Sequence, residues 1–138
     1  MKEKNMINSK ILKITLFIAG LIAAGIGGSI LFLPINFYAT YNIDLGQNLN
    51  LLNEIRASGG ALLTSGLIIL AGVFIEKLTF TSSLLAALLY LSYGLSRVLS
   101  VIVDGLPSEG LQQAAILEII IGCFCVFSFV KFRENKGT

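Results

Sequence analysis

Residues 89–107 read LYLSYGLSRVLSVIVDGLP and decide the fold class. The stretch is an apolar helix pattern of nearly membrane-spanning length, and it ends in a turn that contains Gly and Pro. On a helix that turns about 100° per residue, five of its polar side chains fall within an arc of about 80°. Those side chains are Tyr90, Tyr93, Arg97, Ser100 and Asp104. A polar stripe on an apolar helix is expected to face protein or water, because hydrocarbon cannot satisfy polar groups.

The composition indicates that the whole chain lies in a membrane. The 138 residues are 55% hydrophobic and only 13% charged, with a mean hydropathy of +0.85, whereas soluble domains carry about 25% charged residues. Each crossing needs about 20 apolar residues, so the length allows four crossings with short loops. We therefore predict an all-α integral membrane protein, a single-domain antiparallel bundle of four transmembrane helices over residues 1–138. The expected helices are residues 14–33, 51–75, 80–103 and 111–130.

Basic residues outside the helices fall on one side of this topology. They are Lys2, Lys4, Lys10 and Lys13 near the N-terminus, Lys77 in the second turn, and Lys131, Arg133 and Lys136 near the C-terminus. The two opposite connections have no Lys or Arg outside the helices. The positive-inside rule thus predicts that both termini are cytoplasmic.

Several classes of function lose support at this point. The chain has no histidine, which removes the commonest general base and most zinc sites. We expect no metal, no cofactor and no assignable catalytic residue. No basic domain interleaved with aromatic residues is present, so nucleic acid is not an expected partner. The expected partners are the lipid bilayer and a lipid or small amphipathic ligand.

Small residues recur every four positions in the first helix, at Gly20, Ala24 and Gly28. This spacing lets two helix backbones approach closely in lipid. We expect the three residues to pack against a neighbouring helix of the same chain, with a homo-oligomer contact as the alternative.

Five ionisable residues are predicted to lie in the outer half of the membrane. Arg97 is about 10 Å of helix rise inside Asp104, and Glu118 is about 12 Å inside the start of its own helix, so the two share a depth. Glu54 and Arg56 lie in the first turns of the second helix, at its outer end. Because an unpaired charge in a membrane is costly, we expect Arg97 to pair with Glu118, and Arg56 with Glu54 or Asp104.

This charge cluster, Glu54, Arg56, Arg97, Asp104 and Glu118, has three possible roles. It can be the polar site of an outward-opening pocket, lined also by Asn53, Tyr90, Tyr93 and Ser100, that binds a lipid or small amphipathic ligand through its arginines. It can be a structural feature that only fixes how the helices dock in a structural or accessory subunit. It can also serve a lipid-modifying enzyme, with Glu118 as a general acid opposite Glu54 or Asp104. The ligand hypothesis leads.

Three motifs carry a family resemblance. They are Asn53-Glu54-x-Arg56-x-x-Gly59-Gly60, then Gly94-x-x-Arg97-x-x-Ser100-x-x-x-Asp104-Gly105-x-Pro107, then Glu118-x-x-x-Gly122. Together they resemble the small bacterial membrane proteins grouped as domain of unknown function 4345, over residues 14–130. The resemblance implies a four-helix membrane domain and no settled activity. It also implies a bacterial cytoplasmic (inner) membrane location.

Overall fold

The computed structural model describes residues 9–133, which form helices and short connections with no strand in that range. The predicted all-α class is confirmed, and the predicted positions Lys2, Lys4 and Lys136 lie outside the described residues. The helices are α2 (Lys10–Phe32), α3 (Pro34–Ala39), α4 (Leu49–Phe74), the single 3-10 turn η1 (Glu76–Leu78), α5 (Thr79–Asp104) and α6 (Glu109–Arg133).

Four segments are long and apolar enough to cross a membrane, namely Lys10–Phe32, Leu49–Phe74, Glu76–Asp104 and Glu109–Lys131. Large apolar side chains cover their outward faces, among them Leu21, Phe74, Leu99 and Phe124. Contiguous apolar surface of this extent is rare on a soluble monomer and suits contact with lipid. The molecule therefore has the exterior of a multi-pass membrane protein.

The connection between the first two long helices, for which no helix is predicted, contains the short helix α3. Leu33 leaves the helical region, with φ −130° and ψ 50°, and Pro34 begins α3 at its first position. Proline disfavours helical geometry in the residue before it, yet its own fixed φ suits a helix start. The Pro34 junction therefore ends α2 and begins α3.

Helices α2 and α4 pack backbone against backbone. A Cβ added to Gly27 would lie 2.3 Å from the Leu63 nitrogen, and one added to Gly66 would lie 2.3 Å from the Ala24 nitrogen. Only a residue without a side chain allows this approach, which is how helices associate in lipid.

The small residues of α2 divide between this interface and the outside. A Cβ on Gly20 would meet Leu70 of α4 at 2.8 Å, whereas one on Gly28 would meet nothing within 4 Å. The expected packing within the chain is confirmed for Gly20 and Ala24. A homo-oligomer contact stays a prediction.

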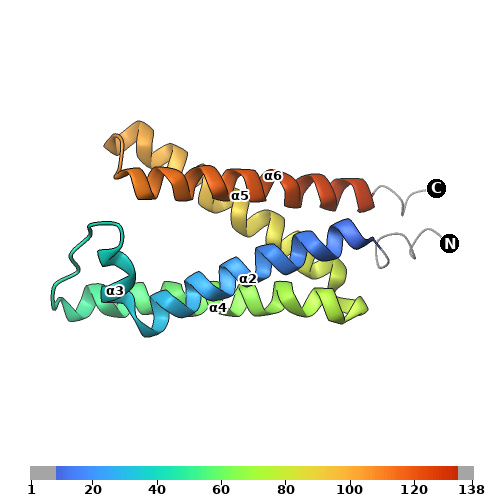
Figure 1. Cartoon of the computed structure of the whole chain (residues 1–138), viewed down its shortest axis with the longest axis horizontal. Coiled ribbons are helices and arrows are strands. Elements are labelled where there is room, and N and C mark those ends of the chain that lie inside the picture. Colours follow the sequence, from blue (N-terminus) through green and yellow to red (C-terminus); the bar gives the residue numbers. More distant parts are fainter. Residues whose placement is uncertain (1–8, 134–138) are drawn as a thin grey trace.

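The four long helices form two pairs that diverge toward one end. Helix α5 runs diagonally from the α2–α4 pair to α6, and the start of α2 lies at the same end as the end of α6 (Figure 1). Near that end the pairs are joined by hydrogen bonds from side chains to backbone carbonyls: Ser82 donates to Ile68 at 2.7 Å and Tyr90 to Ala19 at 2.6 Å. The pairs separate at the opposite end, the α3 end, where α3 and the α5–α6 turn lie (Figure 1).

Candidate functional site

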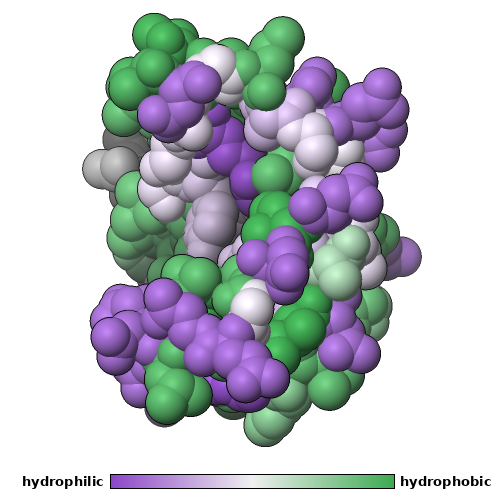
Figure 2. Space-filling view, turned by 90° about the vertical axis from the view of Figure 1, so that its left-hand side faces the viewer, coloured by the Kyte–Doolittle hydropathy of each residue, from purple (hydrophilic) through white to green (hydrophobic). Residues whose placement is uncertain are grey.

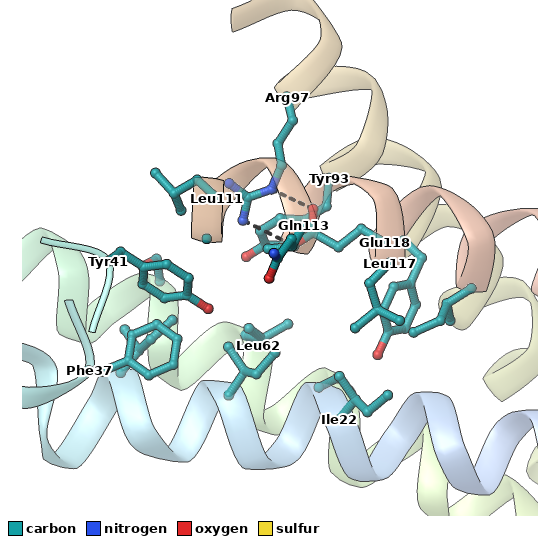
Figure 3. Close-up of a pocket in the computed structure, with 18 of the residues that line it drawn as sticks. Ile22, Phe37, Tyr41, Leu62, Tyr93, Arg97, Leu111, Gln113, Leu117 and Glu118 are labelled. Carbon is teal, nitrogen blue, oxygen red and sulfur yellow. Dashed lines mark hydrogen bonds and ion pairs between the residues drawn. The ribbon is translucent and has the colours of Figure 1, made fainter. Parts of the chain in front are cut away.

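A cavity of about 610 Å³ lies between the two helix pairs at the α3 end. Its volume falls within the range of about 300–1,000 Å³ that is usual for small-molecule sites. Every long helix and the α3 segment contribute to its wall, and most of the contributed side chains are apolar (Figure 3). Those apolar side chains include Ile22, Ile26, Ile30, Phe37, Leu62, Leu89, Leu111, Leu117 and Ile121.

The wall of the cavity carries one ion pair, between α5 and α6. The Arg97 guanidinium donates through Nε to Glu118 Oε2 at 2.5 Å and through Nη2 to Oε1 at 3.0 Å (Figure 3). Both side chains line the cavity and are 31% and 15% exposed. The predicted pairing of Arg97 with Glu118 is confirmed.

Two glycines bring the partners of this pair within reach. A Cβ on Gly94, one turn before Arg97, would lie 2.9 Å from Ile119, and one on Gly122, one turn after Glu118, would lie 3.3 Å from the Leu91 nitrogen. Because α5 and α6 run antiparallel, both glycines lie on the same side of the ion pair, toward the start of α5. The close approach of the two helices there brings the guanidinium against the carboxylate.

Six further polar side chains line the cavity. Ser58 and Tyr90 donate to backbone carbonyls, and the other four are Tyr38, Tyr41, Tyr93 and Gln113. Tyr41, Tyr93 and Gln113 extend into the same space below Arg97 (Figure 3). Within residues 9–133 their hydroxyl and amide groups make no hydrogen bond. Burial raises the pKa of Tyr38, although Arg97 nearby opposes the shift, so this hydroxyl keeps its proton at neutral pH.

The segment after α3 folds back over the cavity. Asn42 adopts a left-handed conformation with φ 60°, which asparagine tolerates better than most residues, and the Ile43 nitrogen donates to the Tyr38 carbonyl at 3.1 Å. The ring of Phe37 packs edge-on against Tyr41 with centroids 5.5 Å apart. Ser108 in the α5–α6 turn donates to the Tyr41 carbonyl at 3.4 Å, so this segment reaches the opposite helix pair.

Figure 2 looks onto this end of the molecule. Hydrophilic surface covers the lower edge and reappears in the recessed middle between two apolar masses (Figure 2). Polar side chains are thus exposed at the α3 end beside apolar ones.

The other predicted charge pairings are wrong. The Arg56 guanidinium donates to the Leu31 carbonyl at the end of α2, where the last helical carbonyls have no partner within the helix. Glu54 is exposed, and within residues 9–133 it forms no ion pair. Both residues belong to the first turns of α4, which lie in the opposite helix pair from the end of α5 (Figure 1).

Asp104 also stands apart from the cavity. Its carboxylate accepts a hydrogen bond of 3.0 Å from Ser100, and both residues are exposed at the end of α5. Asn53 is exposed and lies outside the lining. The expected five-residue buried cluster is therefore wrong: Arg97 and Glu118 are its members in the cavity wall, and no second carboxylate of the described residues joins Glu118 there.

Of the other predicted lining residues, Tyr90 and Tyr93 face the cavity. Ser100 instead lines a small adjacent recess of about 110 Å³ that also touches Arg97. The Tyr90 hydroxyl is already used in its bond to Ala19, so Tyr90 serves packing, whereas Tyr93 offers a free hydroxyl to the cavity.

Sequence reasoning missed Tyr38, Tyr41 and Gln113 as lining residues. The two tyrosines belong to a connection rich in asparagine and tyrosine, a composition typical of a segment at the membrane surface, and no local pattern indicates that this segment returns over the bundle. A signal for Gln113 is present in the sequence. Gln113 precedes Leu117 by four residues and Ile121 by eight, so the three residues share one face of a helix.

Four apolar spanning helices around an internal cavity define this molecule as a multi-pass helical membrane protein. The sequence model described as "Domain of unknown function (DUF4345)" matches residues 11–129. The chain belongs to that family, and the resemblance seen in its motifs is confirmed. Comparison with curated proteins and with solved structures gave no match.

Proposed function

We propose that this protein binds a lipid or small amphipathic molecule in the cavity at the α3 end. The observation that carries the proposal is the composition of the wall, which is largely apolar and holds the Arg97–Glu118 pair and several free hydrogen-bonding groups in one place. A concave apolar site with a few convergent polar groups is the usual form of a small-molecule site. The apolar part of an amphipathic molecule suits the aliphatic wall, and its polar head suits the region of Arg97.

In this proposal the protein lies in a bacterial inner membrane with its α3 end outward. The support is the distribution of basic residues, because Lys10, Lys77 and Lys131 all belong to the opposite end of the bundle. The cavity then faces the outer leaflet, and a lipid of that leaflet is the nearest source of ligand.

A cavity-filling substitution tests the proposal. Ala114 on α6 lines the cavity, whereas Ala61 on α4 is exposed and does not. After purification in a mild detergent, lipids bound to each variant are extracted and quantified by mass spectrometry. We expect Ala114→Phe to retain about one tenth of the lipid bound by the unmodified protein, which corresponds to a loss of roughly 1.4 kcal/mol.

Ala61→Phe is the matched control and is expected to retain the full amount, because the same ring is added to an exposed face of α4. Equal retention by Ala114→Phe and the unmodified protein, with both folded, contradicts a ligand in the cavity.

One observation favours a second candidate, a structural or accessory membrane subunit. The contact between Arg97 and Glu118 is direct and bidentate, which suits a role that only fixes the docking of α5 on α6. In that case Ala114→Phe and Ala61→Phe both carry as much lipid as the unmodified protein, and a partner protein co-purifies at a constant ratio.

A further inference from the structure

We propose that the ligand of this cavity has an uncharged head group that presents carbonyl, ester or hydroxyl oxygens. The inference rests on the proposed function and names the chemical class of the ligand. It excludes a phosphate or an ammonium group at the head.

Charge balance in the wall is the first argument. Of the residues that line the cavity, Arg97 and Glu118 are the charged ones, and their formal charges cancel. Arg56, which was expected to add a second positive charge, lies outside the lining. The cavity therefore has no net charge with which to attract an ionic head.

Competition for the ion pair is the second argument. An anionic head that bonds to Arg97 in place of Glu118 would leave a carboxylate that is only 15% exposed without its partner. A cationic head that bonds to Glu118 would likewise leave the Arg97 guanidinium without its partner. Because an unpaired charge in a poorly hydrated site is strongly unfavourable, an ionic head gains little at this position.

The free hydrogen-bonding groups are the third argument. Within residues 9–133, Arg97 Nη1 makes no hydrogen bond, since Nε and Nη2 carry both bonds to Glu118. The hydroxyls of Tyr38, Tyr41 and Tyr93 and the amide of Gln113 are likewise available in the cavity. A guanidinium has only donors, and hydroxyl and amide groups can both donate and accept.

A head with acceptor oxygens therefore matches the wall. It can accept a charge-assisted bond from Arg97 without displacing Glu118. Ester and carbonyl oxygens meet this need without charge, and hydroxyl groups on the same head can accept from or donate to the three tyrosines.

Three probes with the same acyl chain separate the head-group classes: 1-monooleoylglycerol, which is uncharged, oleoyl lysophosphatidate, which is anionic, and oleoylcholine, which is cationic. The full chain in maltoside micelles is offered all three at equal concentration, and adducts are measured by native mass spectrometry. We expect the monooleoylglycerol adduct to exceed each of the others at least about tenfold, or roughly 1.4 kcal/mol.

The variant Glu118→Gln is expected to change the preferred probe from the uncharged one to the anionic one. It removes the negative charge and leaves Arg97 without a counter-charge in the cavity, so lysophosphatidate is expected to become the main adduct. Glu54→Gln is the matched control, because Glu54 is exposed and outside the lining; it is expected to behave as the unmodified chain.

The double variant Arg97→Met/Glu118→Met keeps the cavity uncharged and is expected to retain the preference for the uncharged probe over both ionic probes. It also serves if Glu118→Gln fails to fold, as judged by circular dichroism. A preference of the unmodified chain for lysophosphatidate or oleoylcholine overturns the inference and leaves lipid binding intact. No adduct with any probe, when Ala114→Phe also changes nothing, overturns the proposed function itself.

Discussion

The Arg97 guanidinium on α5 donates two hydrogen bonds to the Glu118 carboxylate on α6, with Nε 2.5 Å from Oε2 and Nη2 3.0 Å from Oε1. Removing one partner of a buried pair costs about 3–5 kcal/mol, chiefly because the other charge is stranded. Since Arg97 is 31% exposed, we expect Arg97→Met to lower the free energy of unfolding by a smaller amount, about 2 kcal/mol. Circular dichroism during titration with sodium dodecyl sulfate measures this loss.

The double variant Arg97→Met/Glu118→Met separates the stranded charge from the lost contact. With both charges absent, the loss is expected to be smaller than for Arg97→Met alone, because no unpaired carboxylate remains. Arg56→Met is a matched control, since the Arg56 guanidinium forms no ion pair in the described residues and donates to the Leu31 carbonyl at the end of α2. A double variant less stable than Arg97→Met contradicts the explanation.

Two adjacent glycines of α2 are expected to respond oppositely to alanine. In Gly27→Ala the new methyl group would meet the backbone of α4 at 2.3 Å, which forces the helices apart and costs on the order of 1–3 kcal/mol. In Gly28→Ala the methyl group meets nothing within 4 Å, so the gain in helix propensity, up to about 1 kcal/mol, is expected instead. Thermal unfolding in detergent compares the two. Equal transition temperatures would show that the α2–α4 contact is looser than described.

Two tyrosines on one face of α5 are expected to respond differently to removal of the hydroxyl group. The Tyr90 hydroxyl donates to the Ala19 carbonyl at 2.6 Å across α5 and α2, and such bonds in membrane proteins average about 0.6 kcal/mol. We expect Tyr90→Phe to lower stability by roughly that amount. Tyr93→Phe removes a hydroxyl with no hydrogen bond in the described residues, so it should leave stability unchanged and weaken binding of monooleoylglycerol. A loss of stability in Tyr93→Phe that matches Tyr90→Phe is the contrary result.

The class of fold and the Arg97–Glu118 pair were predictable because each depends on a distance that can be counted along the sequence. Apolar length sets the number of spans, and helix rise sets the depth at which the two charges meet. The positions of Arg56 and Asp104 around the bundle were not predictable in this way. Depth places Arg56 near Asp104, but the divergence of the helix pairs separates them, and a backbone carbonyl of α2 takes the guanidinium instead.

The segment after Pro34 shows a second limit of the sequence. This segment is rich in tyrosine and asparagine, as membrane-surface loops are. The same composition is compatible with two positions, at the membrane surface or over the helix bundle. The left-handed Asn42 and the bond from Ser108 to Tyr41 fix the second. The bond from Ser108 to Tyr41 joins residues that are 67 positions apart, and local patterns cannot indicate a contact of that separation.

Tyr41 is expected to control how fast a ligand leaves the cavity. Its ring lies beside Gly110 at the start of α6, where an added Cβ would be 3.0 Å from Cδ1, so the side chain bridges the two helix pairs at the α3 end. In Tyr41→Ala this bridge is absent, and monooleoylglycerol should exchange with its deuterated form about tenfold faster, or roughly 1.4 kcal/mol in the barrier. Native mass spectrometry follows the exchange. Tyr41→Phe keeps the ring and loses only one of the hydrogen-bonding groups available to the head, so it should exchange more slowly than Tyr41→Ala, because the packing contact that forms the bridge remains. Equal rates for the two variants would place the exit elsewhere.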